Sequence, residues 1–186
     1  MDVAGTSADG HAARDTATSW ALRVRDGDAS AAAPFVRATQ AEVWRFVAAV
    51  VDAGSADDLT QETYPREFRA LPAFEGRSTV RTWLPGIARR VCADHLRAVV
   101  RRRRLDARLA TDAPADVPDH AGELAAAELL RRLPADRRVA FVLTQVLGFS
   151  YGEAAEAEQV PVGTIRSRVA RARADLVAAL RSAAVG

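Results

Sequence analysis

The sequence has no lysine, one cysteine and few aromatic residues. Cys92 has no partner for an internal disulfide, which excludes a disulfide-bonded fold and favours a reducing compartment. Its apolar surroundings predict a small core residue rather than a reactive thiol. The three histidines are scattered without the spacing of metal ligands, so we expect no metal ion and no other cofactor.

Long hydrophobic runs are also missing. The N-terminus carries no apolar signal segment, and no run reaches the length of a membrane span. We therefore expect a cytoplasmic protein without a membrane partner. Few aromatic residues and abundant alanine suit small helices better than sheets built from aromatic and β-branched residues, which predicts an all-α fold.

Every basic side chain is an arginine, yet the net charge is only +2. GC-rich codon usage explains the arginine and alanine, but arginine also offers a planar fork that suits phosphates and guanine edges. Five arginines follow Ile165 against the single acid Asp175, whereas residues 57–67 form an acidic stretch. Either patch alone fits an ordinary solvated helix face. The two together indicate two surfaces with different partners.

The spacing of apolar residues divides the first part of the chain into helices. Residues 1–16 are small and polar and predict a disordered tail. Helices are expected from Ala17 to Arg25, from Asp28 or Ser30 through Val50, from a cap at Ser55 or Asp57 through Phe68, and from a cap at Ser78 to Arg104. Residues 17–104 are predicted to form one domain.

A linker and a second domain follow. Residues 105–120 are acidic and richer in proline, which predicts a flexible linker. Residues 121–186 are expected to form four short units: Glu123–Leu133, Pro134–Leu147, a helix opened by a Ser150–Glu153 capping box, and a last helix opened by Gly163 and Thr164. The sequence therefore predicts two small helical domains.

The last helix carries the most informative pattern. At about 100° per residue, one narrow stripe is apolar and is expected to be buried: Ile165, Val169, Ala172 and Leu176. The opposite face is polar or small: Arg166, Ser167, Ala170 and Arg171. An exposed cationic face that follows a tight turn and a short capped helix is typical of a helix-turn-helix that reads DNA.

Each residue type on this face has a use at DNA. Arg166 and Arg171 can each make two hydrogen bonds to a guanine edge, and Ser167 can donate or accept at a base. Ala170 can lie against a thymine methyl group.

Phosphate contacts are expected at the flanks of the same helix. The amides near Gly163 and Thr164 stand at a helix N-terminus, which attracts anions. Arg168 and Arg173 border the buried stripe and suit either phosphates or acids within the domain.

Two sets of motifs resemble a known family. The stretch Leu147–Ala155, followed by Pro161–Val169 and then Arg171–Arg173, resembles the region 4 helix-turn-helix of bacterial extracytoplasmic-function sigma factors. Residues 56–63 are similar to the family's region 2 helix that docks on RNA polymerase. Residues 74–78, 81–84 and 87–89 are similar to the segments that open the minus-10 element. The likeness is nearest to the SigC-like actinobacterial members.

The resemblance implies an alternative sigma factor that recognises a minus-35 element and melts a minus-10 element. Its partners would be the β′ clamp helices and the β flap of core RNA polymerase, double-stranded promoter DNA and the melted non-template strand. An anti-sigma factor is a further family expectation. No catalytic residue is implied, because phosphodiester synthesis belongs to the polymerase.

The resemblance also assigns residues to three surfaces. The polymerase-binding surface comprises Asp57, Asp58, Leu59, Gln61 and Glu62. The minus-10 surface comprises Phe74, Glu75, Gly76, Arg77, Ser78, Arg89, Arg90, Asp94 and Arg97. The minus-35 surface comprises Pro161, Val162, Gly163, Thr164, Arg166, Ser167, Arg168, Ala170, Arg171 and Arg173.

Some of these residues are open to a second interpretation. Leu59 and Phe68 suit packing in the core or at an interface. Trp83 is equally compatible with the core and with a base contact. The run Arg101–Arg104 fits nucleic acid about as well as it fits a solvated helix end.

Three positions depart from the family pattern. Pro65 lies inside the acidic helix, and Pro85-Gly86 interrupts the helix of Trp83. Since an interior proline costs about 3 kcal/mol and kinks or breaks a helix, we expect distortion that can reduce promoter melting. Glu158-Gln159 replaces the usual Leu-Gly, which removes a core contact and the residue that most easily adopts a left-handed conformation.

Two other functions fit the sequence less well. A helix-turn-helix regulator that acts without polymerase would have no reason to carry the acidic surface at residues 57–62. An enzyme is disfavoured, because the sequence shows no nucleophile–base pair, metal-ligand spacing or phosphate-binding glycine loop.

Overall fold

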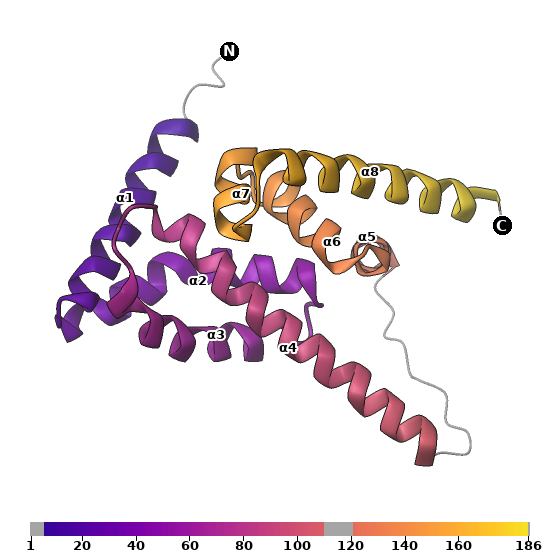
Figure 1. Cartoon of the computed structure of the whole chain (residues 1–186), viewed down its shortest axis with the longest axis horizontal. Coiled ribbons are helices and arrows are strands. Elements are labelled where there is room, and N and C mark those ends of the chain that lie inside the picture. Colours follow the sequence, from indigo (N-terminus) through magenta and orange to yellow (C-terminus); the bar gives the residue numbers. More distant parts are fainter. Residues whose placement is uncertain (1–5, 110–120, 186) are drawn as a thin grey trace.

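The computed structural model describes residues 6–109 and 121–185, and every element within those residues is helical. A first group contains α1 (Thr6–Arg25), α2 (Ala32–Val50), α3 (Ala56–Ala70) and α4 (Val80–Leu109). A second group, orange to yellow in Figure 1, contains α5 (Ala121–Arg132), α6 (Ala135–Phe141), α7 (Tyr151–Glu158) and α8 (Val162–Val185). Three short helical turns complete them: η1 (Ala29–Ala31), η2 (Leu71–Ala73) and η3 (Val142–Val146). The all-α prediction is confirmed.

The first group is held by the apolar stripe that the sequence placed on α2. Phe35, Phe46 and Val47 are almost fully buried. The ring of Phe35 makes edge-on contacts with the rings of Tyr64 and Phe68 on α3, at centroid distances of 6.5 and 6.0 Å. Phe68 is therefore a packing residue. Burial of such side chains contributes about 1.5–3 kcal/mol each, which outweighs the weak helix propensity of aromatic residues.

The helix starts differ in detail from the sequence prediction. The Asp28 carboxylate accepts a hydrogen bond from the Ser30 amide at 3.0 Å and caps the short turn η1, whereas α2 itself starts at Ala32 without a side-chain cap. Ser55 makes no cap bond to α3, and its own amide donates to Asp52. The start of α4 was predicted at a Ser78 cap. Instead the Val80 amide donates to the Thr18 hydroxyl of α1 at 3.0 Å, a tertiary contact that no local pattern reveals.

Two helices are longer than predicted. α1 begins at Thr6, inside the segment that was predicted to be a disordered tail, and α4 continues to Leu109, past the predicted end at Arg104. Both extensions lengthen a helix that is already nucleated by packing, and adding a residue to a formed helix is far easier than starting one. Residues 1–5 of the predicted tail and residues 110–120 of the predicted linker lie outside the described residues.

The interior prolines were expected to kink or break their helices, and neither proline breaks its helix. α3 runs through Pro65 and α4 runs through Pro85 without a break. Each proline removes one backbone hydrogen bond. Pro65 lies on the exposed side of α3, where water can reach the backbone, and Pro85 lies early in a 30-residue helix whose Leu84 and Val91 are buried.

The second group begins and ends its helices largely as the sequence predicts. Pro134 precedes α6 at the N-cap position. The Ser150–Glu153 capping box is confirmed: the Glu153 amide donates to Ser150 Oγ at 3.1 Å, and the Ser150 amide donates to the Glu153 carboxylate at 2.7 Å. Gln159 ends α7 with φ 55°, which is the left-handed conformation. The absence of glycine at this position is therefore destabilising, since a residue with a Cβ in the left-handed conformation costs about 1–2 kcal/mol of conformational free energy.

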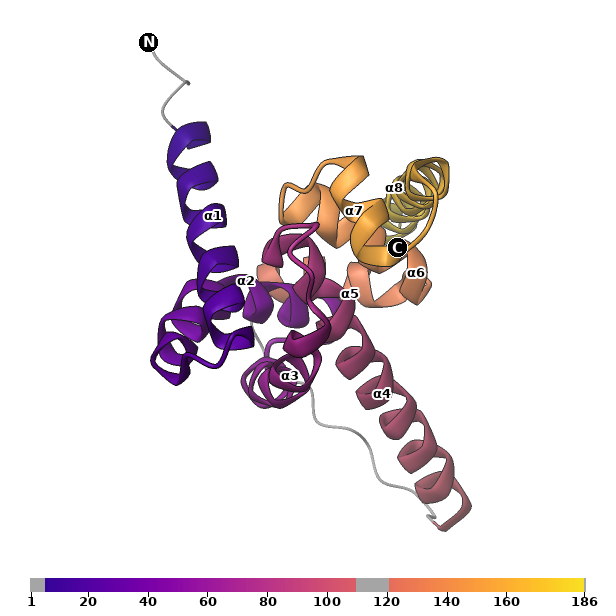
Figure 2. The ribbon, with the colours of Figure 1, turned by 60° about the vertical axis from the view of Figure 1, so that its left-hand side comes forward.

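The two groups pack against each other. One continuous hydrophobic cluster contains Val50 and Leu84 from the first group and Leu143 and Phe149 from the second. α7 lies against α4, and both ribbon views show the two helices side by side (Figures 1 and 2). Arg138 on α6 donates through Nη1 to the carbonyl of Val50 at the end of α2, at 2.5 Å. This carbonyl has no partner within its own helix ladder, so the arginine satisfies it.

Candidate nucleic-acid and polymerase interfaces

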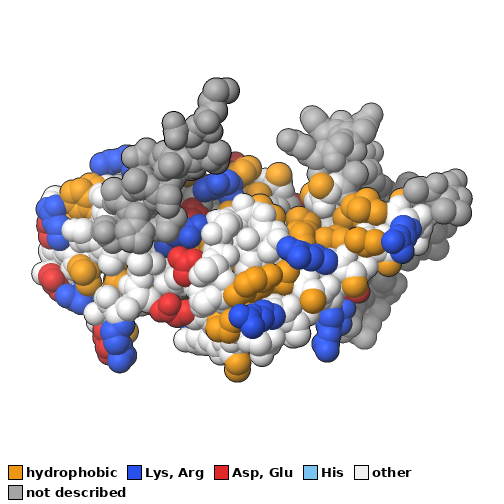
Figure 3. Space-filling model, turned by 90° about the horizontal axis from the view of Figure 1, so that it is seen from above, with side chains coloured by type: hydrophobic (Ala, Val, Ile, Leu, Met, Phe, Trp, Pro, Cys, Tyr) orange, Lys and Arg blue, Asp and Glu red, His pale blue; other side chains and the backbone are white. Residues whose placement is uncertain are grey.

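The buried stripe of α8 matches the prediction from its spacing. Ile165, Val169 and Ala172 are at most 1% exposed, whereas Leu176 is half-buried. The opposite face is exposed and carries Arg166, Ser167, Ala170 and Arg171. Figure 3 shows arginine side chains standing along the face of the molecule over which α8 runs. The predicted DNA-reading residues thus share one accessible helix face.

The turn before α8 presents backbone and hydroxyl groups. Pro161, Val162 and Gly163 are exposed, and the Thr164 amide donates to the Pro161 carbonyl at 2.8 Å. Ser167 Oγ donates to the Thr164 carbonyl at 2.9 Å. In this state its hydroxyl oxygen is free to accept a hydrogen bond, because the hydroxyl proton is already engaged.

Arg168 and Arg173 contact polar groups within the second group of helices. Arg168 Nε lies 3.2 Å from the Asp136 carboxylate, and Arg168 Nη1 lies 3.5 Å from that of Glu158. Arg173 donates to the side-chain oxygen of Gln145 at 2.6 Å. The sequence left phosphates and acids open as partners of these arginines, and the structure shows acids at Arg168.

The acidic face of α3 is exposed except at one position. Asp57, Asp58, Gln61 and Glu62 are accessible, but Leu59 is only 4% exposed and packs in the core. The assignment of Leu59 to a binding surface therefore needs correction, because a buried side chain positions the helix and does not meet a partner.

Neighbouring side chains hold this acidic face in place. Trp44 Nε1 donates to the Asp57 carboxylate at 2.8 Å. Arg66 bridges Glu62 and Asp94, at 2.6 and 2.9 Å. These contacts fix two carboxylates while their remaining lone pairs stay open to a partner.

The loop at residues 74–78 is built differently from the prediction. The ring of Phe74 is 4% exposed and packs on Trp83 with 5.0 Å between centroids, so both rings belong to the core region and Phe74 offers no open stacking surface. Glu75 and Arg77 are exposed and paired with each other. Gly76 has φ 71°, and a Cβ there would lie 3.2 Å from Leu22, so both conformation and space favour glycine.

The arginines assigned to the minus-10 surface fall into two environments. Arg90 and Arg97 are exposed on α4, and Arg97 pairs with Asp94 at 2.7 Å. Arg89 instead points to the second group, where its Nε lies 3.0 Å from the Glu158 carboxylate. The alignment is too poor for a hydrogen bond, so the contact is an ion pair.

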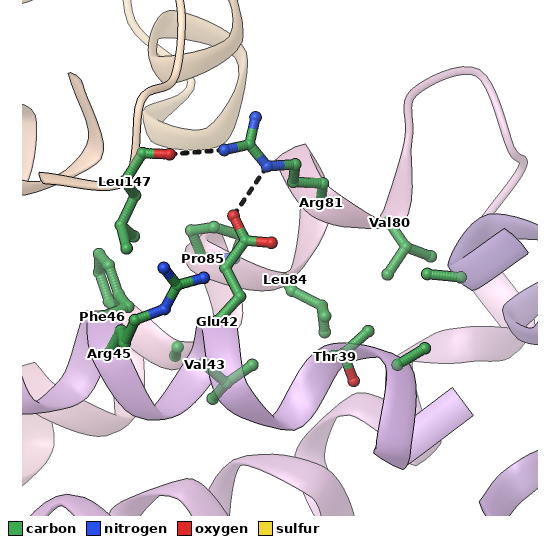
Figure 4. A pocket seen from close by; sticks show the side chains of 13 residues that line it. Thr39, Glu42, Val43, Arg45, Phe46, Val80, Arg81, Leu84, Pro85 and Leu147 are labelled. Atoms are coloured by element: carbon green, nitrogen blue, oxygen red, sulfur yellow. Dashed lines mark hydrogen bonds and ion pairs between the residues drawn. The ribbon is translucent and has the colours of Figure 1, made fainter. Parts of the chain in front are cut away.

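Arg81 belongs to a segment similar to those that open the minus-10 element, and it makes several contacts between the groups. It pairs with Glu42 of α2 at 2.8 Å, donates to the Leu147 carbonyl at 2.6 Å and lies 4.0 Å from the centre of the Phe149 ring. Figure 4 shows Glu42, Arg81 and Leu147 around a cavity of about 240 Å³ between α2 and α4. No sequence pattern joins residues this far apart in the chain.

Two buried carboxyl groups have altered acidity. Burial raises the pKa of Glu67 to about 8, and neither of its carboxylate oxygens has a hydrogen-bond partner among the described residues. Burial also raises the pKa of Glu158, while the nearby Arg89 and Arg168 oppose that shift. The thiol of Cys92 is buried, and its pKa rises to about 12, which agrees with the core position expected from the sequence.

Other kinds of site are missing from the described part of the chain. Its histidine, cysteine, aspartate and glutamate side chains form no group that could hold a metal ion. Within the same residues, no helix is long and apolar enough to cross a membrane.

Comparison with known proteins accounts for both helix groups. The family model for sigma-70 region 2 matches residues 35–104, and that for sigma-70 region 4 matches residues 123–176. The SigC extracytoplasmic-function sigma factor of Mycobacterium tuberculosis is 46% identical over 168 residues, which cover 88% of this chain and 91% of that protein.

Two solved structures are similar in fold. CnrH, in complex with the cytosolic domain of CnrY, superimposes with a TM-score of 0.69 at 27% identity, over 90% of this chain and 99% of that one. The sigma factor RpoE of Bartonella quintana, in complex with the anti-sigma factor NepR, gives 0.62 at 29% identity, over 78% and 94%. The chain belongs to the extracytoplasmic-function family of RNA polymerase sigma factors and is an alternative sigma factor for promoter-directed transcription.

Proposed function

We propose that the two helix groups divide the work of promoter recognition. The second group, α5–α8, reads the minus-35 element through α8. The first group, α1–α4, docks on core polymerase and holds the minus-10 element. One observation carries this proposal: an exposed cationic helix face and an exposed acidic helix face occur in one chain, on different groups of helices.

At the minus-35 element, Arg166 and Arg171 supply base contacts. Both guanidinium groups are exposed on the same face of α8, and a guanidinium can bond O6 and N7 of one guanine. The Thr164 amide donates to Pro161, so the Gly163 amide at the N-terminus of α8 holds a backbone phosphate and fixes the position of the helix on the duplex. Arg168 and Arg173 stand at the edges, where they support the turn or meet phosphates.

At the polymerase, Asp57, Asp58, Gln61 and Glu62 of α3 offer accessible acceptors on adjacent turns. Such a surface suits a basic helical partner, and the β′ clamp helices of core polymerase are the partner that the family likeness suggests. The β flap is proposed for the second group on the same ground. This work belongs in the cytoplasm, where polymerase and promoter DNA meet.

At the minus-10 element, the exposed residues of the predicted surface are Glu75, Gly76, Arg77, Arg90, Asp94 and Arg97. Arginines along α4 can hold the backbone of an opened strand, and melting is driven by capture of unstacked bases. The chain itself performs no bond chemistry. An anti-sigma factor is a further proposed partner, because the Bartonella quintana relative was solved with one.

Reconstituted transcription tests this function. Purified core polymerase and a library of promoter fragments are combined with the wild-type chain and with a variant in which Asp57→Asn and Asp58→Asn remove two charges from α3. We expect promoter-specific transcripts with the wild type and at least a tenfold loss with the variant, since the coupling between close charge pairs across an interface is about 1.5–7 kcal/mol. A fragment that is bound without any polymerase-dependent transcript would favour a regulator that acts alone.

A further inference from the structure

The cavity between α2 and α4 has no role in the three proposed surfaces. Its volume is about 240 Å³, and its walls come from α1, α2, α4 and the segment that follows η3. None of its lining residues belongs to the polymerase-binding, minus-10 or minus-35 surface. The proposed function therefore leaves this cavity without an occupant.

The walls of the cavity are largely apolar. Val43, Val80 and Leu84 are each at most 4% exposed. Figure 4 shows Phe46 and Leu147 at the end of the cavity that lies away from Val80. Apolar walls favour an occupant that removes apolar surface from water. Since an apolar cavity of about 150 Å³ binds benzene, a volume of about 240 Å³ has room for about ten non-hydrogen atoms.

The spacing of the lining residues indicates an extended occupant. On α2 they run from Ala38 to Arg45, which is about 10 Å along a helix that rises 1.5 Å per residue. On α4 they run from Val80 to Ala88, which is about 12 Å by the same rise. An apolar chain that lies between the two helices fits this length better than a compact ring does.

Three charged side chains line the cavity, and they differ in their partners. Arg81 is fully engaged, because it pairs with Glu42 at 2.8 Å and donates to the Leu147 carbonyl at 2.6 Å. Arg45 Nε donates to the Ala41 carbonyl of its own helix at 3.2 Å, and no carboxylate among the described residues pairs with Arg45. Figure 4 shows the Arg45 guanidinium extending toward the cavity without a contact to Glu42. Its two terminal nitrogens are therefore available to a ligand.

The charge of these side chains selects the head group of the ligand. A guanidinium with free nitrogens binds a planar oxyanion through two parallel hydrogen bonds. Glu42 lines the same cavity and limits the negative charge that the site accepts. A doubly charged phosphate head would meet repulsion from Glu42, whereas Arg45 balances a singly charged carboxylate.

We propose that this cavity is a binding site for a small apolar carboxylate of the medium-chain fatty-acid class. The carboxylate binds Arg45, and the chain lies between α2 and α4 against Val43 and Leu84. The site is independent of the proposed function, because it uses none of the residues of the three surfaces. Its occupation can therefore be measured on the free chain, without DNA or polymerase.

The first test is a nuclear magnetic resonance titration of the full-length chain with sodium octanoate, below the concentration at which octanoate aggregates. We expect the methyl resonances of Val43, Val80 and Leu84 to shift and to saturate. Val177 and Leu180 are exposed apolar residues on α8, so their methyl groups report general adsorption of an amphiphile. No saturable shift at the cavity, or shifts of equal size at Val177 and Leu180, overturns the proposal.

The second test concerns the carboxylate head. We expect Arg45→Gln to weaken octanoate binding about tenfold, because a charge-assisted contact is lost. Arg37→Gln is the matched control, since Arg37 is exposed on the same helix and does not line the cavity. Octan-1-ol has the same chain without the charge, and we expect the wild type and Arg45→Gln to bind it equally. Equal octanoate affinities of Arg45→Gln and Arg37→Gln overturn the role of Arg45.

The third test concerns the position of the chain. Ala38 and Ala41 are both exposed on α2, so a larger side chain at either position leaves the buried core unchanged, but only Ala38 lines the cavity. We expect Ala38→Leu to weaken octanoate binding roughly fivefold or more, because the added carbons take up volume that the ligand needs. Ala41→Leu should bind as the wild type does. With helical circular dichroism intact in both variants, equal affinities overturn the assignment of this cavity as the site.

Discussion

At the scale of single residues, exposure separates the side chains that can contact a partner from those that only position their helix. Arg171 and Arg166 stand free on α8, whereas Leu59 and Phe74 are buried despite their place in the family motifs. The two buried glutamates, Glu158 and Glu67, differ in their neighbours. Glu158 is buried next to two arginines, and Glu67 is buried with no hydrogen-bond partner for either carboxylate oxygen among the described residues.

Arg171→Ala should relax sequence preference at one position of the minus-35 element. A bidentate arginine–guanine contact discriminates by about 1–3 kcal/mol, so the preferred base should lose roughly tenfold or more of its advantage. Selection of binding sites from a randomised duplex measures this preference. Arg181→Ala, at the exposed far end of α8, is the control. Uniform weakening across all sequences would instead assign Arg171 to a phosphate.

Glu67 should make stability fall as pH rises. Its pKa is raised from about 4.5 to about 8, so between these values the folded chain holds a proton that the unfolded chain has released. The free energy of unfolding then decreases by up to about 1.4 kcal/mol per pH unit across this window. Glu67→Gln keeps the shape of the side chain without its ionisation. We expect the free energy of unfolding, measured by urea unfolding, to fall less between pH 5 and pH 8 in this variant than in the wild type. An identical dependence of the unfolding free energy on pH in both proteins would contradict the protonated state of Glu67.

At the scale of elements, packing overrides local propensity where the two conflict. α3 and α4 continue through Pro65 and Pro85, since the buried faces of these helices outweigh one lost hydrogen bond at each proline. At the end of α7 the backbone is strained at a single residue, because Gln159 adopts a left-handed conformation although it carries a side chain.

Gln159→Gly should stabilise the protein by about 1 kcal/mol, since glycine adopts this conformation without the steric cost of a Cβ. Thermal unfolding followed by circular dichroism measures the change as a higher melting temperature. Gln40→Gly is the matched control, because Gln40 is exposed in the middle of α2, where glycine should destabilise by about 0.5–1 kcal/mol. A lower melting temperature for Gln159→Gly would show that the side chain itself stabilises the turn.

At the scale of the whole molecule, the two helix groups share one hydrophobic cluster and several polar contacts. Arg138 satisfies the end of α2, and Arg81 joins α2, α4 and the segment after η3. Packing of this extent should couple the unfolding of the two groups, although the comparisons assign them to separate regions of the family.

This coupling predicts that the free chain unfolds in one transition. All three tryptophans, Trp20, Trp44 and Trp83, belong to the first group, so their fluorescence reports on that group alone. Far-ultraviolet circular dichroism reports on the helices of both groups. We expect the two probes to give the same urea midpoint. A circular dichroism transition that continues after the fluorescence transition is complete would show that the second group unfolds independently.

The helical class, the capping box of α7 and the exposed cationic face of α8 can be predicted from the chain alone, because each follows from residue types at short spacing. The family likeness rests on the same kind of local information. Four features follow instead from tertiary packing: the burial of Phe74, the burial of Leu59, the hydrogen bond from Val80 to Thr18 at the start of α4, and the ion pair between Arg89 and Glu158. These features depend on residues that are distant in sequence and close in space, and no periodicity records which helix will lie against another. The cationic face of α8 was therefore predictable from the chain alone. The link from α8 to α4 through Glu158 depends on the packing of α7 against α4.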